Sequence, residues 1–364
     1  MTPAPTFAAL TLAPSELGAF IVCLGLAGVG ALTLFRAAQR WPGGLAPAGA
    51  FTRRLWSSVS WSLGVRHRAR LPSARRLGPY ALESKIGEGG QGVVYRARRT
   101  GSSTPLAVKL LAGECTHARQ QRFEREGRLA AGLRHPNTVT IYDQGRTEEG
   151  ISYYAMELLD GLTLEELVTR HGPLPAGRVI HILRQLGAAL AAAHERGLVH
   201  RDIKPANVYV CAHAHPPDLV KLLDFGLVRE VTHASDPSVS AAHVLLGTPL
   251  FLSPEAISTP ERVDARADIY GVGAVAYFLM TGKTPFSGRN TIEVCAHHLH
   301  TLPEAPSRHA PVPPDLERVI LTCLAKDPAA RPASAAELVR ALEQCEAMGS
   351  WEARDAEAWW QGRR

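Results

Sequence analysis

The interpretation of this chain rests on the stretch His200-Arg201-Asp202-Ile203-Lys204-Pro205-Ala206-Asn207, followed by Asp224-Phe225-Gly226. Asp202 is suited to accept a proton from a hydroxyl group, and Lys204 is suited to neutralise a phosphate. Asn207 and Asp224 supply the hard oxygen ligands that Mg²⁺ prefers. Together these groups are the set that moves the γ-phosphoryl group of Mg·ATP to a hydroxyl.

These residues resemble the catalytic loop and the metal loop of eukaryotic-like protein kinases. The form Lys204-Pro205-Ala206-Asn207 is that of Ser/Thr kinases, and the closest likeness is to bacterial membrane-anchored Ser/Thr kinases. The resemblance implies an α+β fold in two lobes, preceded by one transmembrane helix. The small lobe would be an antiparallel sheet with one helix, and the larger lobe would be helical. The implied ligands are ATP, Mg²⁺ (or Mn²⁺) and proteins that present Ser or Thr.

A glycine-rich loop, Gly87-Glu88-Gly89-Gly90-Gln91-Gly92-Val93-Val94, precedes this stretch. Its backbone can approach phosphates closely because glycine has no Cβ. In a dinucleotide-binding fold such a loop opens a helix, whereas residues 93–97 alternate and are rich in β-branched and aromatic side chains, which indicates a strand. No Gly-Lys-Ser/Thr follows, so a phosphate-loop NTPase is disfavoured. By the resemblance, the nucleotide would contact Ile86, Gly87, Glu88, Gly89, Gly90, Gln91, Gly92, Val94 and Ala107.

A lysine, Lys109, ends the apolar strand pattern Leu106-Ala107-Val108. In the family that the chain resembles, this lysine grips the α- and β-phosphates and pairs with a glutamate on the next helix. Glu126 matches the family pattern. Glu124 is the alternative, although an exposed helical charge paired with Arg128 at i,i+4 would also explain it.

Residues 153–161 are typical of a strand that ends in a hinge between lobes. By the resemblance, Met156 stands behind the adenine, while the Glu157 carbonyl and the Leu159 amide hydrogen-bond its edge. Asp160 would reach the ribose, although Asp-Gly is also simply a good turn.

The segment from Gly247 to Glu255 resembles the substrate-docking end of an activation segment, with Ser253 in place of the family's Ala. A buried Glu255 would need a partner, and Arg331 matches the family's partner. Asp268 resembles the acid that starts the central helix of the large lobe and holds the backbone of the catalytic loop.

Arg201 precedes the catalytic acid and in this family meets a phosphate on the activation segment, a contact for which Arg is suited. We therefore expect autophosphorylation in the polar stretch before Thr248, at one or more of Thr232, Ser235, Ser238 and Ser240. Thr248 is excluded because in Ser/Thr kinases it supports the catalytic loop. A homodimer that phosphorylates itself in trans is an expected partner.

Residues 17–35 form 19 consecutive positions without a charge, close to the roughly 20 that span a bilayer. No Lys or Arg precedes them, and nine Arg follow between positions 36 and 76 with no acid among them. The positive-inside rule predicts residues 1–16 outside and a cytoplasmic kinase domain, in a single-pass protein of the cell (inner) membrane. A cleaved signal peptide is the rival, but it would have a basic start and a shorter apolar core.

The net charge of +6 belongs to the arginine-rich linker, residues 36–79. Without its nine Arg, 31 of the 40 basic residues remain against 34 acidic ones, so no nucleic-acid partner is expected. In the linker Phe51, Leu55, Val59 and Leu63 recur every four residues. This pattern would lie on the anionic lipid of the inner leaflet. A disordered tether explains the composition equally well.

The kinase domain is expected at 80–345 and a C-terminal tail at 346–364, where Trp351, Trp359 and Trp360 would dock on the large lobe or fray. The six cysteines show no paired spacing, which indicates reduced thiols. Two histidine groups, His213-x-His215 and His297-His298-x-His300, lack the second ligand pair of a zinc site.

Two other functions share this fold. A pseudokinase would bind or scaffold without transfer, but it would be expected to lose Lys109, Asp202, Asn207 or Asp224, and all four are present. A small-molecule kinase is disfavoured by the peptide-docking segment at residues 247–255.

Overall fold

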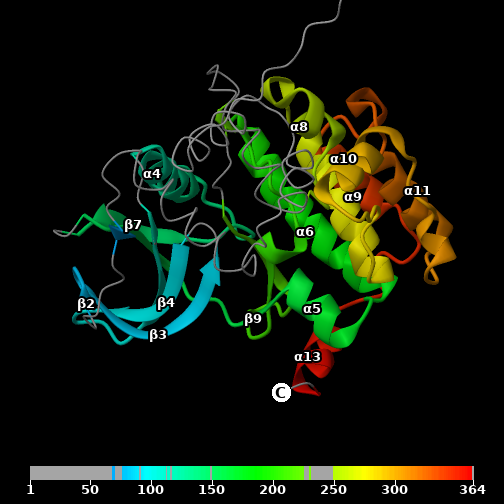
Figure 1. Ribbon diagram of the computed structural model, residues 1–364. Helices are drawn as coiled ribbons and strands as arrows, with labels where there is room; N and C mark the ends of the chain where they lie inside the picture. The colour runs from blue at the N-terminus through cyan, green and yellow to red at the C-terminus, as the bar shows by residue number, and fades with distance from the viewer. Residues whose placement is uncertain are drawn as a thin grey trace, which may run out of the picture. The chain divides into compact units, whose positions relative to one another are not determined.

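The computed structural model describes residues 68–69, 76–89, 92–111, 113–114, 117–147, 150–224, 229–230 and 249–362, all within one unit, Arg66–Arg364. Antiparallel strands with helix α4 form one lobe of this unit, and helices dominate the other (Figure 1). This is the two-lobed arrangement that the sequence predicted. Among the described residues no helix is long and apolar enough to span a membrane, and the expected span at 17–35 lies outside them.

The small lobe is built on a six-stranded sheet with the order β2-β3-β4-β5-β8-β7, in which all neighbours are antiparallel. Its strands are β2 (Arg76–Leu77), β3 (Tyr80–Gly89), β4 (Gly92–Arg99), β5 (Pro105–Leu110), β7 (Ile141–Arg146) and β8 (Ser152–Glu157). The sheet therefore begins at Arg76, within the segment that we expected to be linker. Helix α4 (His117–Gly132) packs against β7 and β8, with Phe123 on the ring of Tyr154.

Gly92 illustrates a close approach that the sequence motif does not reveal. A Cβ at this position would collide with the carbonyl oxygen of Leu110 in the neighbouring strand β5. The glycine is therefore required by strand packing at the end of the loop, apart from any role at a phosphate.

The large lobe has one extensive apolar core, formed mainly by α6 and α9 and the elements around them. Its helices are α5 (Leu164–His171), α6 (Ala176–His194), α8 (Pro254–Ser258), α9 (Arg266–Thr281), α10 (Thr291–His300), α11 (Pro314–Cys323), α12 (Ala335–Glu343) and α13 (Ala353–Gln361). Short 3₁₀ turns are η1 (Pro205–Asn207), η2 (Pro260–Arg262), η3 (Pro306–Arg308) and η4 (Pro328–Ala330). Thr163 and Glu166 form a capping box that starts α5, which satisfies two backbone donors at once.

Short strands position residues 200–207. A three-stranded sheet has the order β12-β11-β9, and its strands are β9 (Gly161–Thr163), β11 (Val208–Cys211) and β12 (Leu219–Leu222). Two-residue pairs join β10 (Leu198–Val199) to β13 (Arg229–Glu230) and β1 (Arg68–Ala69) to β6 (Gly113–Glu114). Val208 lies opposite Leu222, and the Leu223 amide donates to the Asn207 carbonyl at 2.9 Å. This pairing brings residues 200–207 beside Asp224.

Candidate active site

Lys109, at the end of β5, contacts two carboxylates from different parts of the chain. Its Nζ lies 2.9 Å from Glu126 Oε1 on α4 and 2.6 Å from Asp224 Oδ1, which follows β12. Lys109 and Glu126 are each 4% exposed. The Tyr154 hydroxyl, from β8, donates to Glu126 Oε1 at 2.8 Å. Three elements of the small lobe and one of the large lobe thus meet at this lysine.

The charges in this cluster shift one another's proton affinity. Burial alone would lower the pKa of Lys109, but Asp224 and Glu126 outweigh it and raise that pKa. Burial and the negative charge of Asp224 raise the pKa of Glu126, against the opposing effect of Lys109. Although burial opposes it, Lys109 lowers the pKa of Asp224, so Asp224 is an anion at neutral pH.

Asp202 is the centre of a second cluster. Its Oδ2 accepts from Lys204 Nζ at 2.7 Å and from Asn207 Nδ2 at 2.9 Å. Asn207 Nδ2 also donates to the Asp202 carbonyl at 2.8 Å. The side chain of Asp202 keeps 20% of its surface exposed, so a substrate hydroxyl could reach it.

Asp268, buried in the first turn of α9, holds the backbone before Asp202. Its oxygens accept from the amides of His200 (2.9 Å) and Arg201 (2.7 Å), and His194 Nε2 lies 2.8 Å from its Oδ2. Burial alone would raise the pKa of Asp268, but the hydrogen bond from His194 and nearby positive charge lower it. Arg201 has a positive φ of 66°, a backbone conformation that needs such support in a residue other than glycine.

Glu255 and Arg331 lie together, as the family resemblance implied. Arg331 Nη1 and Nη2 lie 2.6 and 2.8 Å from the two carboxylate oxygens of Glu255. The Arg331 side chain is fully buried. Ser253, which stands where the family has Ala, caps the N-terminus of α8 by accepting from the Ala256 amide.

A family model for the protein kinase domain matches residues 80–342. The chain belongs to the protein kinase family. The match covers both clusters described above and ends before α13.

Individual relatives of this kinase domain are bacterial Ser/Thr protein kinases. The chain is 40% identical over 266 residues to the serine/threonine-protein kinase pkn3 of Myxococcus xanthus, with 70% of this chain and 48% of the relative aligned. It is 38% identical over 265 residues to PknB of Mycolicibacterium smegmatis, with 71% and 41% aligned. It is 37% identical over 267 residues to PknL of Mycobacterium tuberculosis, with 72% and 65% aligned. The chain thus spans less than half the length of pkn3 and PknB.

The residues expected around the nucleotide lie mainly on four neighbouring strands of the sheet, β3, β4, β5 and β8. Gly87 lies opposite Val94 in β3 and β4, and Ala107 lies opposite Met156 in β5 and β8. Ile86 is 51% exposed, and Glu88 pairs with Lys85. Leu159 follows β8 and is half-buried. The expected residues Gly90 and Gln91 lie outside the described part of the chain.

The alternatives left open by the sequence are separated in space. Glu126 contacts Lys109, whereas Glu124 accepts hydrogen bonds from Gln120 and Ser152 at 2.9 Å each. The side chain of Asp160 is 78% exposed, with His213 Nε2 at 3.6 Å. Thr248 and the candidate phosphosites Thr232, Ser235, Ser238 and Ser240 lie outside the described residues.

The described histidines and cysteines show no metal-binding arrangement, and several of them are buried. Within the described ranges, no three His, Cys, Asp or Glu residues gather as a metal-holding group. Burial lowers the pKa of His298 to about 4, and its Nδ1 lies 2.9 Å from the Tyr270 hydroxyl. Four cysteines of the described residues are buried thiols: Cys211, Cys295, Cys323 and Cys345.

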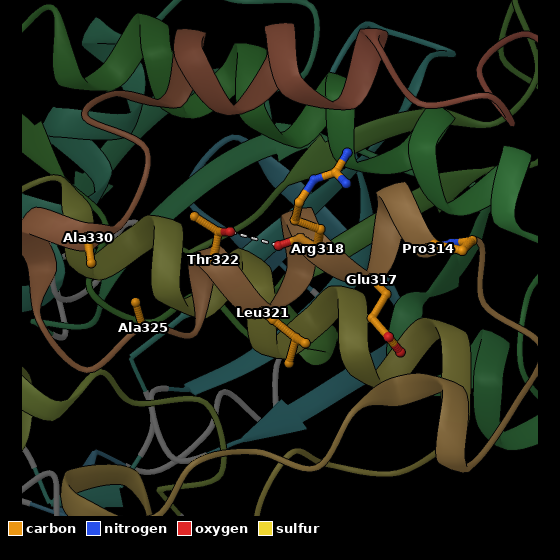
Figure 2. Close-up of a pocket in the computed structure, with 7 residues that line it drawn as sticks. All are labelled: Pro314, Glu317, Arg318, Leu321, Thr322, Ala325 and Ala330. Atoms are coloured by element: carbon orange, nitrogen blue, oxygen red, sulfur yellow. Dashed lines mark hydrogen bonds between the residues drawn. The ribbon is translucent and has the colours of Figure 1, made fainter.

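A surface pocket lies on α11 and η4 (Figure 2), and none of the candidate active-site residues lines it. It is lined by Pro314, Glu317, Arg318, Leu321, Thr322, Ala325 and Ala330. The Thr322 hydroxyl donates to the Arg318 carbonyl within its own helix, and the Glu317 carboxylate accepts from the Ser307 amide. Both groups already serve the local fold, so we assign the pocket no function.

Sequence reasoning missed two residues that hold the site. Tyr154 donates to Glu126. The only sequence feature that could have predicted this role is its position in an apolar strand, two residues before Met156. Lys221 in β12 lies 2.8 Å from Glu157 Oε1 and is 7% exposed, so it fixes the side chain of Glu157. A lysine inside the apolar run Leu219–Leu222 was the available signal.

Proposed function

We propose that this protein transfers the γ-phosphoryl group of ATP to Ser and Thr hydroxyls of proteins. The observation that carries the proposal is the convergence of Lys204 and Asn207 on the carboxylate of Asp202. This cluster stands beside Asp224, which pairs with Lys109. Membership of the protein kinase family and the Ser/Thr specificity in the names of its relatives support the same activity.

The mechanism would depend on positioning and electrostatics. Asp202 would orient the substrate hydroxyl and accept its proton. Lys204, next to that carboxylate, would offset the charge that develops on the transferred phosphoryl group. Lys109, held by Glu126, would bind the α- and β-phosphates, and the residues of the glycine-rich loop would cover them.

The donor set fits a divalent cation. Asp224 is an anion at neutral pH, and the nitrogen of the Asn207 amide donates to Asp202, so its oxygen is the atom that would serve a metal. Two hard oxygen donors suit Mg²⁺ or Mn²⁺, which takes its remaining ligands from water and phosphates. When bound, the metal would neutralise phosphate charge.

The proposal is tested by incubating the full-length protein with labelled ATP, Mg²⁺ and a generic basic protein, and by identifying the labelled amino acids. We expect label on Ser and Thr, and none after chelation of the metal. ATP binding without transfer under any metal would show a pseudokinase, and label on a small molecule alone would show a different kinase class.

Autophosphorylation of the activation segment is part of the proposed function. Arg201 Nη2 donates to the Val263 carbonyl at 3.0 Å, which holds its guanidinium beside the residues that follow α8. A phosphate on Thr232, Ser235, Ser238 or Ser240 would be its partner. We propose that transfer occurs in trans between two copies of the chain.

We further propose a single-pass inner-membrane protein with its kinase domain in the cytoplasm. The uncharged residues 17–35 and the nine Arg that follow support this topology. The arginine-rich linker would add contacts with anionic lipid.

A further inference from the structure

The C-terminal tail, residues 346–362, is docked on the large lobe by its tryptophans. This tail lies beyond the family match, which ends at residue 342. The indole N–H groups of Trp351 and Trp360 both donate to the carboxylate of Asp218, at 3.0 and 2.6 Å. Helix α13 lies next to α5 (Figure 1), where Trp359 packs edge-on against His171. The sequence left open whether the tail docks on the large lobe or frays, and in the structure it docks.

The tail completes a buried ion pair. Arg178 Nε and Nη2 donate to the two oxygens of Asp218 at 2.8 and 2.9 Å, and both side chains are 0% exposed. Each Asp218 oxygen thus accepts one guanidinium and one indole N–H. The Arg178 guanidinium carbon lies 3.9 Å from the ring centre of Trp359 and 4.9 Å from that of Trp351. A buried ion pair is stable only when such hydrogen bonds offset its desolvation.

The fit extends along the tail. The Glu346 amide donates to Asp315 Oδ2 at 2.6 Å, and Ala356 is 1% exposed. A Cβ on Gly177, in the first turn of α6, would collide with the hydroxyl of Ser350. The first turn of α6 and the tail are therefore in direct contact, and a larger residue at position 177 would require Ser350 to shift.

Hydrogen bonds lead from Asp218 towards the catalytic clusters. The Asp218 carbonyl accepts from Gln185 Nε2 at 2.9 Å. Gln185 Oε1 accepts from Asn137 Nδ2 at 2.9 Å and from the Val220 amide at 3.0 Å. The Asn137 carbonyl in turn accepts from the Leu222 amide at 2.8 Å.

The network ends at two residues, Asn137 and Leu222, that lie close in sequence to the elements of the candidate active site. Asn137 lies between α4, which carries Glu126, and β7. Leu222 ends β12, two residues before Asp224. Asp218 itself has a positive φ of 58°, a conformation that contacts such as those of the tail must hold.

We propose that the C-terminal tail is a positioning element of the kinase, which acts through Asp218 and Gln185 on the segment around Asn137 and on β12. Catalytic efficiency then depends on the indole N–H donors of Trp351 and Trp360, although neither touches substrate. The inference rests on the proposed phosphoryl transfer for its kinetic consequence alone. The structural coupling between the tail and Asn137 can be measured without any phosphoryl transfer. Such coupling is carried by a chain of contacting groups, and amide exchange reports on it directly.

The first test is the double variant Trp351→Phe, Trp360→Phe in the full chain, which keeps two aromatic rings and removes both N–H donors. We expect kcat to fall about tenfold and the KM for ATP to rise, since an error at supporting residues misplaces the reacting groups. Amide exchange at Val139 and Leu222, which bond across this segment, should accelerate. Glu343→Gln is the matched control because it removes the charge from another contact of α6 with the C-terminal region, the exposed Arg184–Glu343 pair, and should change none of these values.

The second test is Gln185→Met, which breaks the link while leaving the indole contacts in place. We expect the same loss of kcat with unchanged exchange in α13, and combination with the Trp variants should add little more, since residues in one network are not additive. A lower Tm with wild-type kcat, KM for ATP and exchange at Val139 and Leu222 would overturn the proposal. If the Trp variant does not fold, Gln185→Met decides by the same criteria. A wild type without transferase activity would refute the proposed function, while the exchange measurements would still decide the coupling.

Discussion

Glu255 and Arg331, 76 positions apart, form a two-point ion pair with N···O distances of 2.6 and 2.8 Å. Arg331 also donates to the carbonyls of Ala325, Arg266 and Lys326. One side chain thus joins α8, the start of α9 and the loop after α11. The arrangement makes Arg331 a support of the segment on which a peptide substrate would dock.

Replacement of this arginine should destabilise the large lobe. We expect Arg331→Met to lower the free energy of unfolding by about 3–5 kcal/mol, because it leaves the Glu255 carboxylate without its cation in a largely buried place. Chemical denaturation of the full chain measures this value. The pair Arg266–Asp264, whose side chains are 35% and 46% exposed, provides the control, and Arg266→Gln should cost less than about 1 kcal/mol. Equal effects of the two variants would contradict a special role for Arg331.

Asp202→Asn should remove the proton acceptor without removing the fold. We expect transfer from ATP to fall by at least about 10²-fold, the usual contribution of a general base, while ATP binding stays near the wild-type value. Label transfer and nucleotide titration of the same sample measure the two quantities. Wild-type transfer by Asp202→Asn would refute the role given to this residue.

Lys109→Met should abolish transfer and make stability depend on pH. In the folded protein burial raises the pKa of Glu126 above its value of about 4.3 in the unfolded chain, and loss of the lysine raises it further. A raised folded pKa gives stability at low pH that is lost as pH rises through that pKa. We therefore expect a loss of about 3 kcal/mol at pH 7 and a smaller loss at pH 5.

The double variant Lys109→Met, Glu126→Gln is the control for this pH dependence, because the amide cannot titrate. Its stability relative to wild type should change much less between pH 5 and pH 7. Persistence of the full pH dependence in the double variant would assign it to another group. Asp224, the other carboxylate that pairs with Lys109, would then be the next residue to replace, as Asp224→Asn.

Substitution of Thr232, Ser235, Ser238 and Ser240 together by Ala should remove phosphate from the activation segment and lower activity. The reason is the loss of the phosphate that Arg201 would bind. Mass spectrometry after incubation with Mg·ATP measures the phosphate, and label transfer measures the activity. Unchanged values of both would refute the regulatory role of these hydroxyls.

The membrane topology has its own test. Full-length protein should stay in the membrane fraction through high-salt and alkaline washes, whereas deletion of residues 1–35 should leave only the salt-sensitive contacts of the arginine-rich linker. A mature chain that begins between Arg36 and Phe51 would reveal signal-peptide cleavage. A reporter after Arg364 that is active only outside the cytoplasm would reverse the orientation.

The sequence by itself determined the family and the two-lobed fold. Residues 200–207 form one continuous segment, and the glycine-rich loop forms another. The order and spacing of the residues within each segment therefore indicate the chemistry without knowledge of the packing. The strand that follows Gly92 was also readable, because alternation over five residues is a local property of the chain. The resemblance then named Glu255 and Arg331 as partners, which spacing alone could not do.

Only the tertiary structure decided which residues meet across long separations. It added Tyr154 and Lys221 to the site, and it placed Trp351 and Trp360 on Asp218, 133 and 142 positions away in the sequence. It also places Glu126, which the family pattern had favoured, rather than Glu124 at Lys109. Glu124 and Glu126 are two positions apart on the same helix, so their side chains point in different directions. That direction is set by packing of the whole helix against the sheet, which no local pattern contains.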